Sequence, residues 1–265
     1  MAADAAHAFA QSVANACANV LGEAIAGVIL HGSMATSDYV PGQSDIDLLI
    51  VVNDQLTDGQ IASLRDAIEA VMAGAPAPMD LRVVTRHVAL APTKAPFMDA
   101  YFRIKAGHPA LLTETRHAEP DLAVELSVSR ANGQALLGPA PAELIAEVPK
   151  RLILEVDDQQ LARWQEVGSD LEHAVIEVLT ACRIWQFTEE GRHTSKTEAG
   201  RWMLAKAPGL EVVRQALRRR HMTTTLPIDL DQVQQLLALV RDRVNDELRP
   251  RTDAEHPGEH QLGHL

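Results

Sequence analysis

The sequence predicts an α+β N-terminal domain, with a short mixed sheet flanked by helices, followed by an all-α helical bundle. Over the first 90 residues, segments with helical periodicity alternate with short apolar runs that are typical of buried strands. From Arg151 to Leu248, by contrast, nearly every segment has apolar residues at three-four spacing. We therefore expect two domains, over residues 1–150 and 151–249, and a flexible tail over 250–265, which is polar and not periodic.

The first half begins with an alanine-rich amphipathic helix, predicted over residues 3–25. A short strand in GVILHGS and a buried strand in SDIDLLIVV are predicted next. The segment LTDGQIASLRDAIEAVMAG then has helical periodicity, with Asp58 as its candidate N-cap and a glycine at its end. A proline-rich turn leads into a third strand, in APAPMDLRVVT.

Residues 86–150 show less hydrophobic periodicity than the segments before them. Residues 86–119 contain scattered prolines and histidines, and the element that we predict there is a short helix near Met98–Lys105. A further helix is predicted after Pro120, through Ala131. The segment ALLGPAPAELIAEVP has the proline and glycine density of a connection between domains, and it sets the boundary near residue 150.

Composition limits the class of protein. Hydrophobic residues make up 46% of the chain and charged residues 23%, which are ordinary globular values. The longest apolar run, Leu48–Val52, is far shorter than the roughly 20 residues that a membrane-spanning helix needs. Asp4 lies where a signal peptide carries basic residues, and two cysteines, Cys17 and Cys182, cannot build a disulfide framework. We expect no membrane association and a cytoplasmic location.

Charge limits the partners. The chain has 36 acidic and 24 basic residues, a formal net charge of −12, which repels phosphate backbones and favours cationic small molecules. We therefore expect a small-molecule cationic substrate and no nucleic acid. The eleven histidines form no H-x-x-x-H or H-E-x-x-H pair, so a zinc enzyme is not indicated. A self-contained cleft between two domains requires no partner, and we expect a monomer.

The strongest chemical signal is a pair of acidic residues at the start of the second strand. Asp45 and Asp47 are two positions apart, so in a strand their carboxylates point to the same side. Like charges that close are costly unless a cation neutralises them, and hard oxygen ligands suit Mg²⁺. The alternative is that the Asp-x-Asp pair merely opens a strand. Together with the turn described next, it predicts that Asp45 and Asp47 are metal ligands.

Two further features lie beside this pair in the predicted sheet. Gly32 allows close approach of the backbone to a ligand, and Ser33 adds a hydroxyl and amide donors, as in a small phosphate cradle. An ordinary turn is the alternative for them. Asp80 begins the third strand, where pairing with the second would place it beside Asp45 and Asp47. It is predicted to act as a general base on an attacking hydroxyl or as a further metal ligand, unless the register leaves it as a solvated carboxylate at the strand edge.

At these residues the sequence resembles the nucleotidyltransferase superfamily, whose pattern of Gly-Ser, about ten residues and then Asp-x-Asp on a strand is matched by GSMATSDYVPGQSDID. In the second half, VLTACRIWQFTEEGRHTSKTEAGRWMLAKAP resembles the helical C-terminal domain of the aminoglycoside adenylyltransferases that modify streptomycin and spectinomycin. With PDLAVELSVSRANGQALLGPAP, the resemblance covers roughly residues 25–245.

The resemblance implies antibiotic resistance through a Mg²⁺-dependent transfer of AMP from ATP to a hydroxyl of an aminoglycoside-type drug, streptomycin or spectinomycin, with release of pyrophosphate. By it, Asp45 and Asp47 would hold Mg²⁺ on ATP, and Ser33 would contact the phosphates. Asp80, which stands where the resistance enzymes usually carry Glu, would deprotonate the drug hydroxyl. Lys196 matches a family lysine assigned to the phosphates, although a solvated residue at a helix start is the alternative.

The resemblance also implies contacts to the drug. Trp164 matches a family tryptophan that helps to recognise streptomycin, and a core tryptophan is the alternative. Asp170 and Glu172 lie close enough in sequence to accept hydrogen bonds from a guanidinium or amine. The family's drug-binding acid and histidine fall on His173 and Ile176 without gaps, and on Asp170 and His173 with a gap.

Other basic residues are expected to be structural. Leu217–His221 is predicted to be a solvated helix end, and Arg183, with Trp185 and Trp202, to join helices. Two other functions stay open: a nucleotidyltransferase that acts on another small molecule or on a protein side chain, and a module that binds nucleotide or drug without catalysis.

Overall fold

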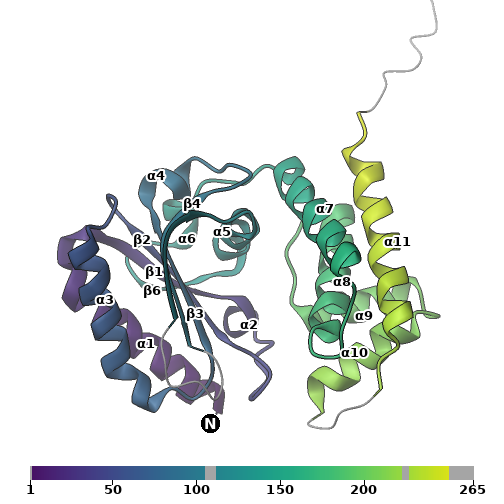
Figure 1. The fold of residues 1–265 in the computed structure, drawn as a ribbon, viewed down its shortest axis with the longest axis horizontal. Helices are drawn as coiled ribbons and strands as arrows, with labels where there is room; N and C mark the ends of the chain where they lie inside the picture. The colour runs from purple at the N-terminus through teal and green to yellow at the C-terminus, as the bar shows by residue number, and fades with distance from the viewer. Residues whose placement is uncertain (1, 105–111, 223–226, 251–265) are drawn as a thin grey trace, which may run out of the picture.

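The computed structural model describes residues 2–104, 112–222 and 227–250, and it places a six-stranded mixed sheet beside a group of helices (Figure 1). The strand order is β5-β4-β3-β2-β1-β6; β2 and β3 are parallel and all other pairs are antiparallel. The fold class predicted from the sequence is confirmed. The strands are β1 (Ile25–His31), β2 (Ile46–Val52), β3 (Met79–Thr85), β4 (Phe97–Ile104), β5 (Leu112–Ala118) and β6 (Gln134–Leu137).

Helices cover both faces of the sheet. Alternate residues of β2, such as Leu48 and Ile50, pack toward α1 (Ala2–Leu21) and α3 (Asp58–Val71), whereas Leu49 and Val51 face the opposite side. On that opposite side lies α5 (Asp121–Asn132), between the sheet and the C-terminal helices (Figure 1). Because β2 is buried on both faces, its run of apolar side chains is continuous. The shorter elements are 3₁₀ helices at Gly22–Ala24 and Met72–Gly74, α2 (Gly32–Ala35), α4 (Arg86–Leu90) and α6 (Pro141–Leu144).

The second half is helical, as its periodicity predicts. Its apolar residues pack into one cluster that also includes side chains from the α5 face of the sheet, for example Leu49 and Val84. The helical region begins at α7, close to the predicted boundary near residue 150, but the shared core means that the division into two domains stays a prediction. The helices are α7 (Lys150–Val167), α8 (Ala174–Glu190), α9 (Lys196–Lys206), α10 (Glu211–His221) and α11 (Leu230–Leu248).

Three predictions of local structure are wrong. The helix near Met98–Lys105 is strand β4, in which Ala100, Phe102 and Ile104 alternate toward the α1 and α3 face; Lys105 itself lies outside the described residues. The N-cap of α3 is Thr57 and not Asp58: the Gln60 amide donates to the Thr57 hydroxyl, and the Thr57 amide donates to the Gln60 side chain.

The third correction concerns the supposed connection ALLGPAPAELIAEVP. It contains most of strand β6, which pairs with β1 at the sheet edge, and also helix α6. A four-residue strand is too short to show a period, and its partner lies far away in the sequence. Of the tail predicted over 250–265, only Pro250 is described. No helix among the described residues is long and apolar enough to cross a membrane.

Candidate active site

Four polar side chains form a row across β1, β2, β3 and β4, near one end of these strands. His31 on β1 pairs with Asp47 on β2, Asp47 with Asp80 on β3, and Asp80 with Arg103 on β4. Directly paired residues lie on the same face of a sheet, so the row faces α5. The Arg103 Nε lies 3.2 Å from the Asp80 Oδ1, and the Asp80 side chain is 12% exposed. The structure therefore places Asp80 beside Asp47, as the predicted pairing of the strands requires.

The Gly32–Ser33 turn lies directly against this row. Gly32 has a φ of +64°, and a Cβ built on it would lie only 2.0 Å from the Asp47 Oδ2. Only glycine allows both the left-handed backbone and this close approach. The Ser33 hydroxyl is buried and has no hydrogen-bond partner among the described residues. A cradle of this kind, with an unpaired hydroxyl beside a carboxylate, fits a bound metal and phosphate.

We expect Gly32→Ala to destabilise the protein by more than the about 1 kcal/mol that the backbone strain alone costs, because the new methyl group collides with the Asp47 carboxylate. Thermal melting would measure the loss. Gly191→Ala is the matched control, since Gly191 has a φ of +67° and no atom within 4 Å of an added Cβ. Equal losses in the two variants would contradict the close approach.

A cavity of about 370 Å³ opens between the turn and the C-terminal helices. Apart from Glu172, the acidic lining residues come from the first half of the chain and form an acidic wall, whereas all the basic ones come from the C-terminal helices and form a basic wall. A polyphosphate with a bound metal ion would fit between them, with the cation facing the acidic wall and the phosphates facing the basic wall. The acidic wall includes Asp45 and Asp47 beside Gly32 and Ser33, and the basic wall includes Arg183, Lys196, Arg219 and Arg220.

Burial, together with the crowding of like charges, shifts the pKa values of groups on both walls. Burial raises the pKa of Asp47 to about 8, and the negative charge of Glu125 adds to this. Burial and the charge of Asp80 likewise raise the pKa of Asp45. Burial lowers the pKa of Lys196 to about 8, and the positive charge of Arg183 adds to it. A cation on the first wall and an anion on the second would therefore each relieve repulsion.

The cavity brings together five of the predicted site residues, namely Gly32, Ser33, Asp45, Asp47 and Lys196. Asp80 is not among the lining residues, although the strand register holds it next to Asp47. The structure brings these six residues close together, and their roles stay predictions.

The three predicted drug contacts lie elsewhere. Trp164, in the last turns of α7, packs against the apolar core, which is the alternative that the sequence left open. Asp170 and His173 pair with each other, with 2.9 Å between Oδ2 and Nδ1, and are 61% and 57% exposed. None of the three lines the cavity, whereas their neighbours Glu172 and Ile176 do. Their part in drug binding stays a prediction.

One expectation about basic residues is wrong, and another stays a prediction. Arg183 lines the cavity, and its predicted role of joining helices stays a prediction. Leu217–His221 is not a wholly solvated helix end, because Arg220 within it is buried and pairs with Asp38. An arginine inside the apolar run VLTACRIW was a usable signal for Arg183. No signal separates Arg220 from the two arginines before it, because its partner lies in the other half of the chain.

Glu125 is a further cavity residue that the sequence did not single out. It lies on α5, and its Oε2 is 3.3 Å from the His31 Nδ1, at the β1 end of the polar row. Arg82 lies two residues after Asp80, on the same face of β3, and is close to Glu125. Burial lowers the pKa of Arg82, but the negative charges of Glu125 and Asp80 raise this pKa by more. A charged arginine therefore lies beneath the acidic wall.

A small cavity of about 30 Å³ lies behind Arg183 and is also lined by Asp157. Burial raises the pKa of Asp157 from 3.8 to about 7. The folded protein thus keeps a proton that the unfolded chain loses, so the stability contributed by Asp157 is present below about pH 4 and is lost as the pH rises to about 7.

We therefore expect the stability of Asp157→Asn, which has no proton to lose, to rise relative to that of the unchanged protein as the pH goes from 5 to 8, by up to about 1.4 kcal/mol for each pH unit below about pH 7. Thermal or urea unfolding of both proteins at the two pH values would measure the difference. If the difference in stability between the two proteins is the same at pH 5 and pH 8, the pKa of Asp157 is not raised.

Comparisons with known proteins match both halves of the chain. The model described as "Nucleotidyltransferase domain" matches residues 14–135, and that described as "Aminoglycoside adenylyltransferase, C-terminal domain" matches residues 143–244. A spectinomycin 9-adenylyltransferase of Staphylococcus aureus is 28% identical over 198 residues, which cover 72% of this chain and 75% of that protein. An aminoglycoside (3'') (9) adenylyltransferase of Klebsiella pneumoniae is 28% identical over 191 residues, covering 68% and 71%.

A solved structure shares the fold. It is the crystal structure of a spectinomycin adenyltransferase from Enterococcus faecialis with ATP and spectinomycin, and it matches 90% of this chain and 99% of its own with a TM-score of 0.72. At 16% sequence identity this match concerns the fold alone.

Proposed function

Because the chain belongs to the aminoglycoside adenylyltransferase family of the nucleotidyltransferase superfamily, we propose that it transfers AMP from ATP to a hydroxyl of an aminoglycoside-type antibiotic, streptomycin, spectinomycin or both, with release of pyrophosphate. The observation that carries the proposal is the cavity with its acidic and basic walls. The relatives, which are named for transfer to spectinomycin and to aminoglycosides, support the choice of acceptor.

Asp45 and Asp47 are the residues that would hold Mg²⁺, and the cradle at Gly32 and the unpaired Ser33 hydroxyl fit that assignment. When bound, the metal neutralises charge on the phosphates and so supports displacement at phosphorus. Lys196, across the cavity, places a point charge toward the same phosphates. Together these groups position ATP and balance its charge, which is most of what phosphoryl-type transfer needs from a protein.

Asp80 is the proposed general base. Its carboxylate accepts the proton of the drug hydroxyl as that oxygen forms a bond to the α-phosphorus of ATP. The bond from the α-phosphorus to the oxygen bridging to the β-phosphorus breaks, and pyrophosphate leaves with that electron pair. Arg103, 3.2 Å from Asp80, keeps the carboxylate oriented along the polar row.

The acceptor is proposed to approach from the side of the 168–173 segment, between α7 and α8. Glu172 lines the cavity there and offers a carboxylate to a cationic drug, with Trp164, Asp170 and His173 as the further proposed contacts. The net charge of −12 favours such an acceptor. Both walls of the cavity come from one chain, which supports the expectation of a monomer.

Pyrophosphate release from ATP and Mg²⁺, with streptomycin and spectinomycin supplied separately, tests the proposal. We expect release with at least one drug. A protein that binds ATP but releases no pyrophosphate with either drug would contradict the choice of acceptor. Labelling of a protein or of another metabolite by ATP in a lysate would then indicate the other nucleotidyltransferase function.

A further inference from the structure

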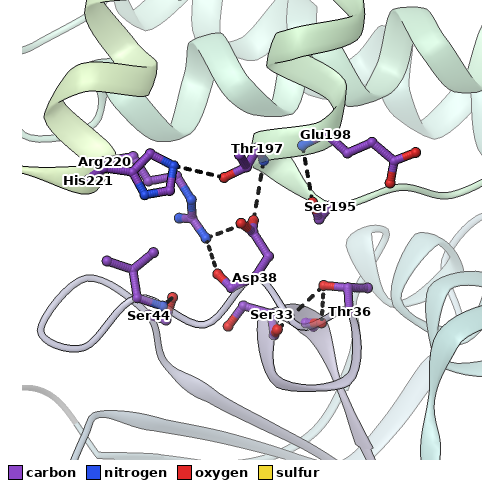
Figure 2. A network of polar contacts seen from close by, with 11 residues as sticks. Ser33, Thr36, Asp38, Ser44, Ser195, Thr197, Glu198, Arg220 and His221 are labelled. Atoms are coloured by element: carbon purple, nitrogen blue, oxygen red, sulfur yellow. Dashed lines mark hydrogen bonds and ion pairs between the residues drawn. The ribbon is translucent and has the colours of Figure 1, made fainter. Parts of the chain in front are cut away.

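Asp38 lies at the centre of a polar network that joins the two halves of the chain (Figure 2). It belongs to the loop between α2 and β2, and its side chain is 9% exposed. Arg220, from α10, donates from Nη2 to the Asp38 carboxylate at 3.0 Å and to the Asp38 carbonyl at 2.8 Å. The backbone amide of Thr197, in α9, donates to the same carboxylate at 3.2 Å.

The three groups bound to Asp38 all belong to the proposed nucleotide site. The Asp38 amide donates to the Ser33 carbonyl at 2.9 Å and so fixes the Gly32–Ser33 turn. Thr197 directly follows Lys196 in the first turn of α9. Arg220 lines the cavity itself. One residue therefore connects the turn, the start of α9 just after Lys196, and Arg220, which belong to three different elements.

Arg220 also has capacity left over for a ligand. Its side chain is 6% exposed, and its Nε is buried without a hydrogen-bond partner among the described residues. The end of α10 is tied to α9 by a further contact, 3.2 Å between the His221 Nε2 and the Thr197 hydroxyl (Figure 2). Arg220 is thus a lining residue of the cavity whose guanidinium is held in place and has an N–H without a partner among the described residues, and such a guanidinium is a prepared donor for an anion.

We propose that Asp38 is a positioning residue of the nucleotide site, and that Arg220, which it orients, binds the polyphosphate together with Ser33 and Lys196. This inference rests on the proposed function, since it assigns the anion as ATP. Asp38 does more than fill the place of a phosphate, because its backbone is hydrogen-bonded as well as its carboxylate. Its amide donates to the Ser33 carbonyl and its carbonyl accepts from Arg220, so the loop is held both to the turn and to α10. ATP then binds to donors that are already arranged, which lowers the entropic cost of binding.

The test is ATP binding in the presence of Mg²⁺, measured by calorimetry on the full chain, for the unchanged protein, Asp38→Asn, Arg220→Gln and the double variant. A hydrogen bond to a charged group makes about a tenfold difference in affinity or more. We expect Kd to rise by about tenfold or more in each single variant. Because Asp38 acts through Arg220, the double variant is expected to bind ATP about as weakly as the weaker single variant.

The control is Lys94→Gln. The Lys94–Glu155 ion pair also joins the two halves of the chain, between the loop before β4 and α7, but neither residue lines the cavity. We expect its Kd for ATP to stay unchanged. Arg220→Lys keeps a positive charge beside Asp38, so this variant is expected to fold even if Arg220→Gln does not. Its Kd for ATP is expected to lie between those of the unchanged protein and Arg220→Gln.

Two outcomes would overturn the inference. If Asp38→Asn lowers the melting temperature but binds ATP with unchanged Kd, Asp38 is only structural. If Asp38→Asn binds ATP more tightly, Asp38 competes with the phosphates for Arg220. Failure of the unchanged protein to bind ATP is a different result, since it would contradict the proposed function and the inference with it.

Discussion

Asp47→Asn is expected to reduce AMP transfer by about a thousandfold or more while leaving the fold intact. The variant removes the charge of a proposed metal ligand, and metal-assisted charge stabilisation contributes several kcal/mol to such reactions. The fold is expected to survive because burial raises the pKa of Asp47 to about 8, so without a cation the carboxyl is largely neutral at pH 7. An amide of the same shape replaces a neutral acid at little cost.

Pyrophosphate release would measure the activity of Asp47→Asn, and thermal melting its stability. Asp54→Asn is the matched control, because Asp54 is exposed just beyond the opposite end of β2. We expect that variant to keep full activity. Unchanged turnover in Asp47→Asn would end the argument for a metal at this position.

The second large effect is expected from Asp80→Asn, with a fall in kcat of about 10²- to 10⁴-fold through loss of the general base. KM for ATP is expected to change little, because Asp80 is proposed to act on the drug hydroxyl and not to hold ATP. Arg103 loses its partner in this variant, but it is 40% exposed and water can solvate it, so the fold should persist.

Asp80→Glu is the control for this variant. It keeps a carboxylate at a position where the resembling resistance enzymes usually carry Glu, and we expect activity within about tenfold of the unchanged protein. Steady-state kinetics with the drug that supports pyrophosphate release would measure both variants. If Asp80→Asn were as active as Asp80→Glu, the base would have to be another group.

The fold could be predicted where local pattern and tertiary environment agree. The continuous apolar run of β2 indicates burial on both faces, and pairing β2 with β3 follows from their order, which places Asp80 beside Asp47. β4 also carries a buried carboxylate, that of Asp99, at a polar position of its alternating pattern, and nothing local in the sequence indicates that this position is buried. That carboxylate is buried because it accepts a hydrogen bond from the Leu56 amide, a contact between segments far apart in the sequence.

The site could be predicted only where its chemistry is contiguous in sequence. Gly32, Ser33, Asp45 and Asp47 belong to one short motif, and the structure brings them to one cavity wall. The basic wall depends on packing between distant helices, which no local pattern records. Arg220 is one of three consecutive arginines, and the Asp38 carboxylate that pairs with it lies on a loop of the first half.

Strand β6 has a consequence for how the chain must be made. β1 carries the Gly32–Ser33 turn at its end, and one side of β1 is covered only when residues near Leu137 pair with Val28. A nascent chain, or a recombinant fragment, that stops before residue 134 leaves the backbone amides and carbonyls of β1 open along that side. Open strand edges recruit other strands and so promote aggregation. Fragments of the N-terminal half should therefore extend through Leu137 to stay in solution.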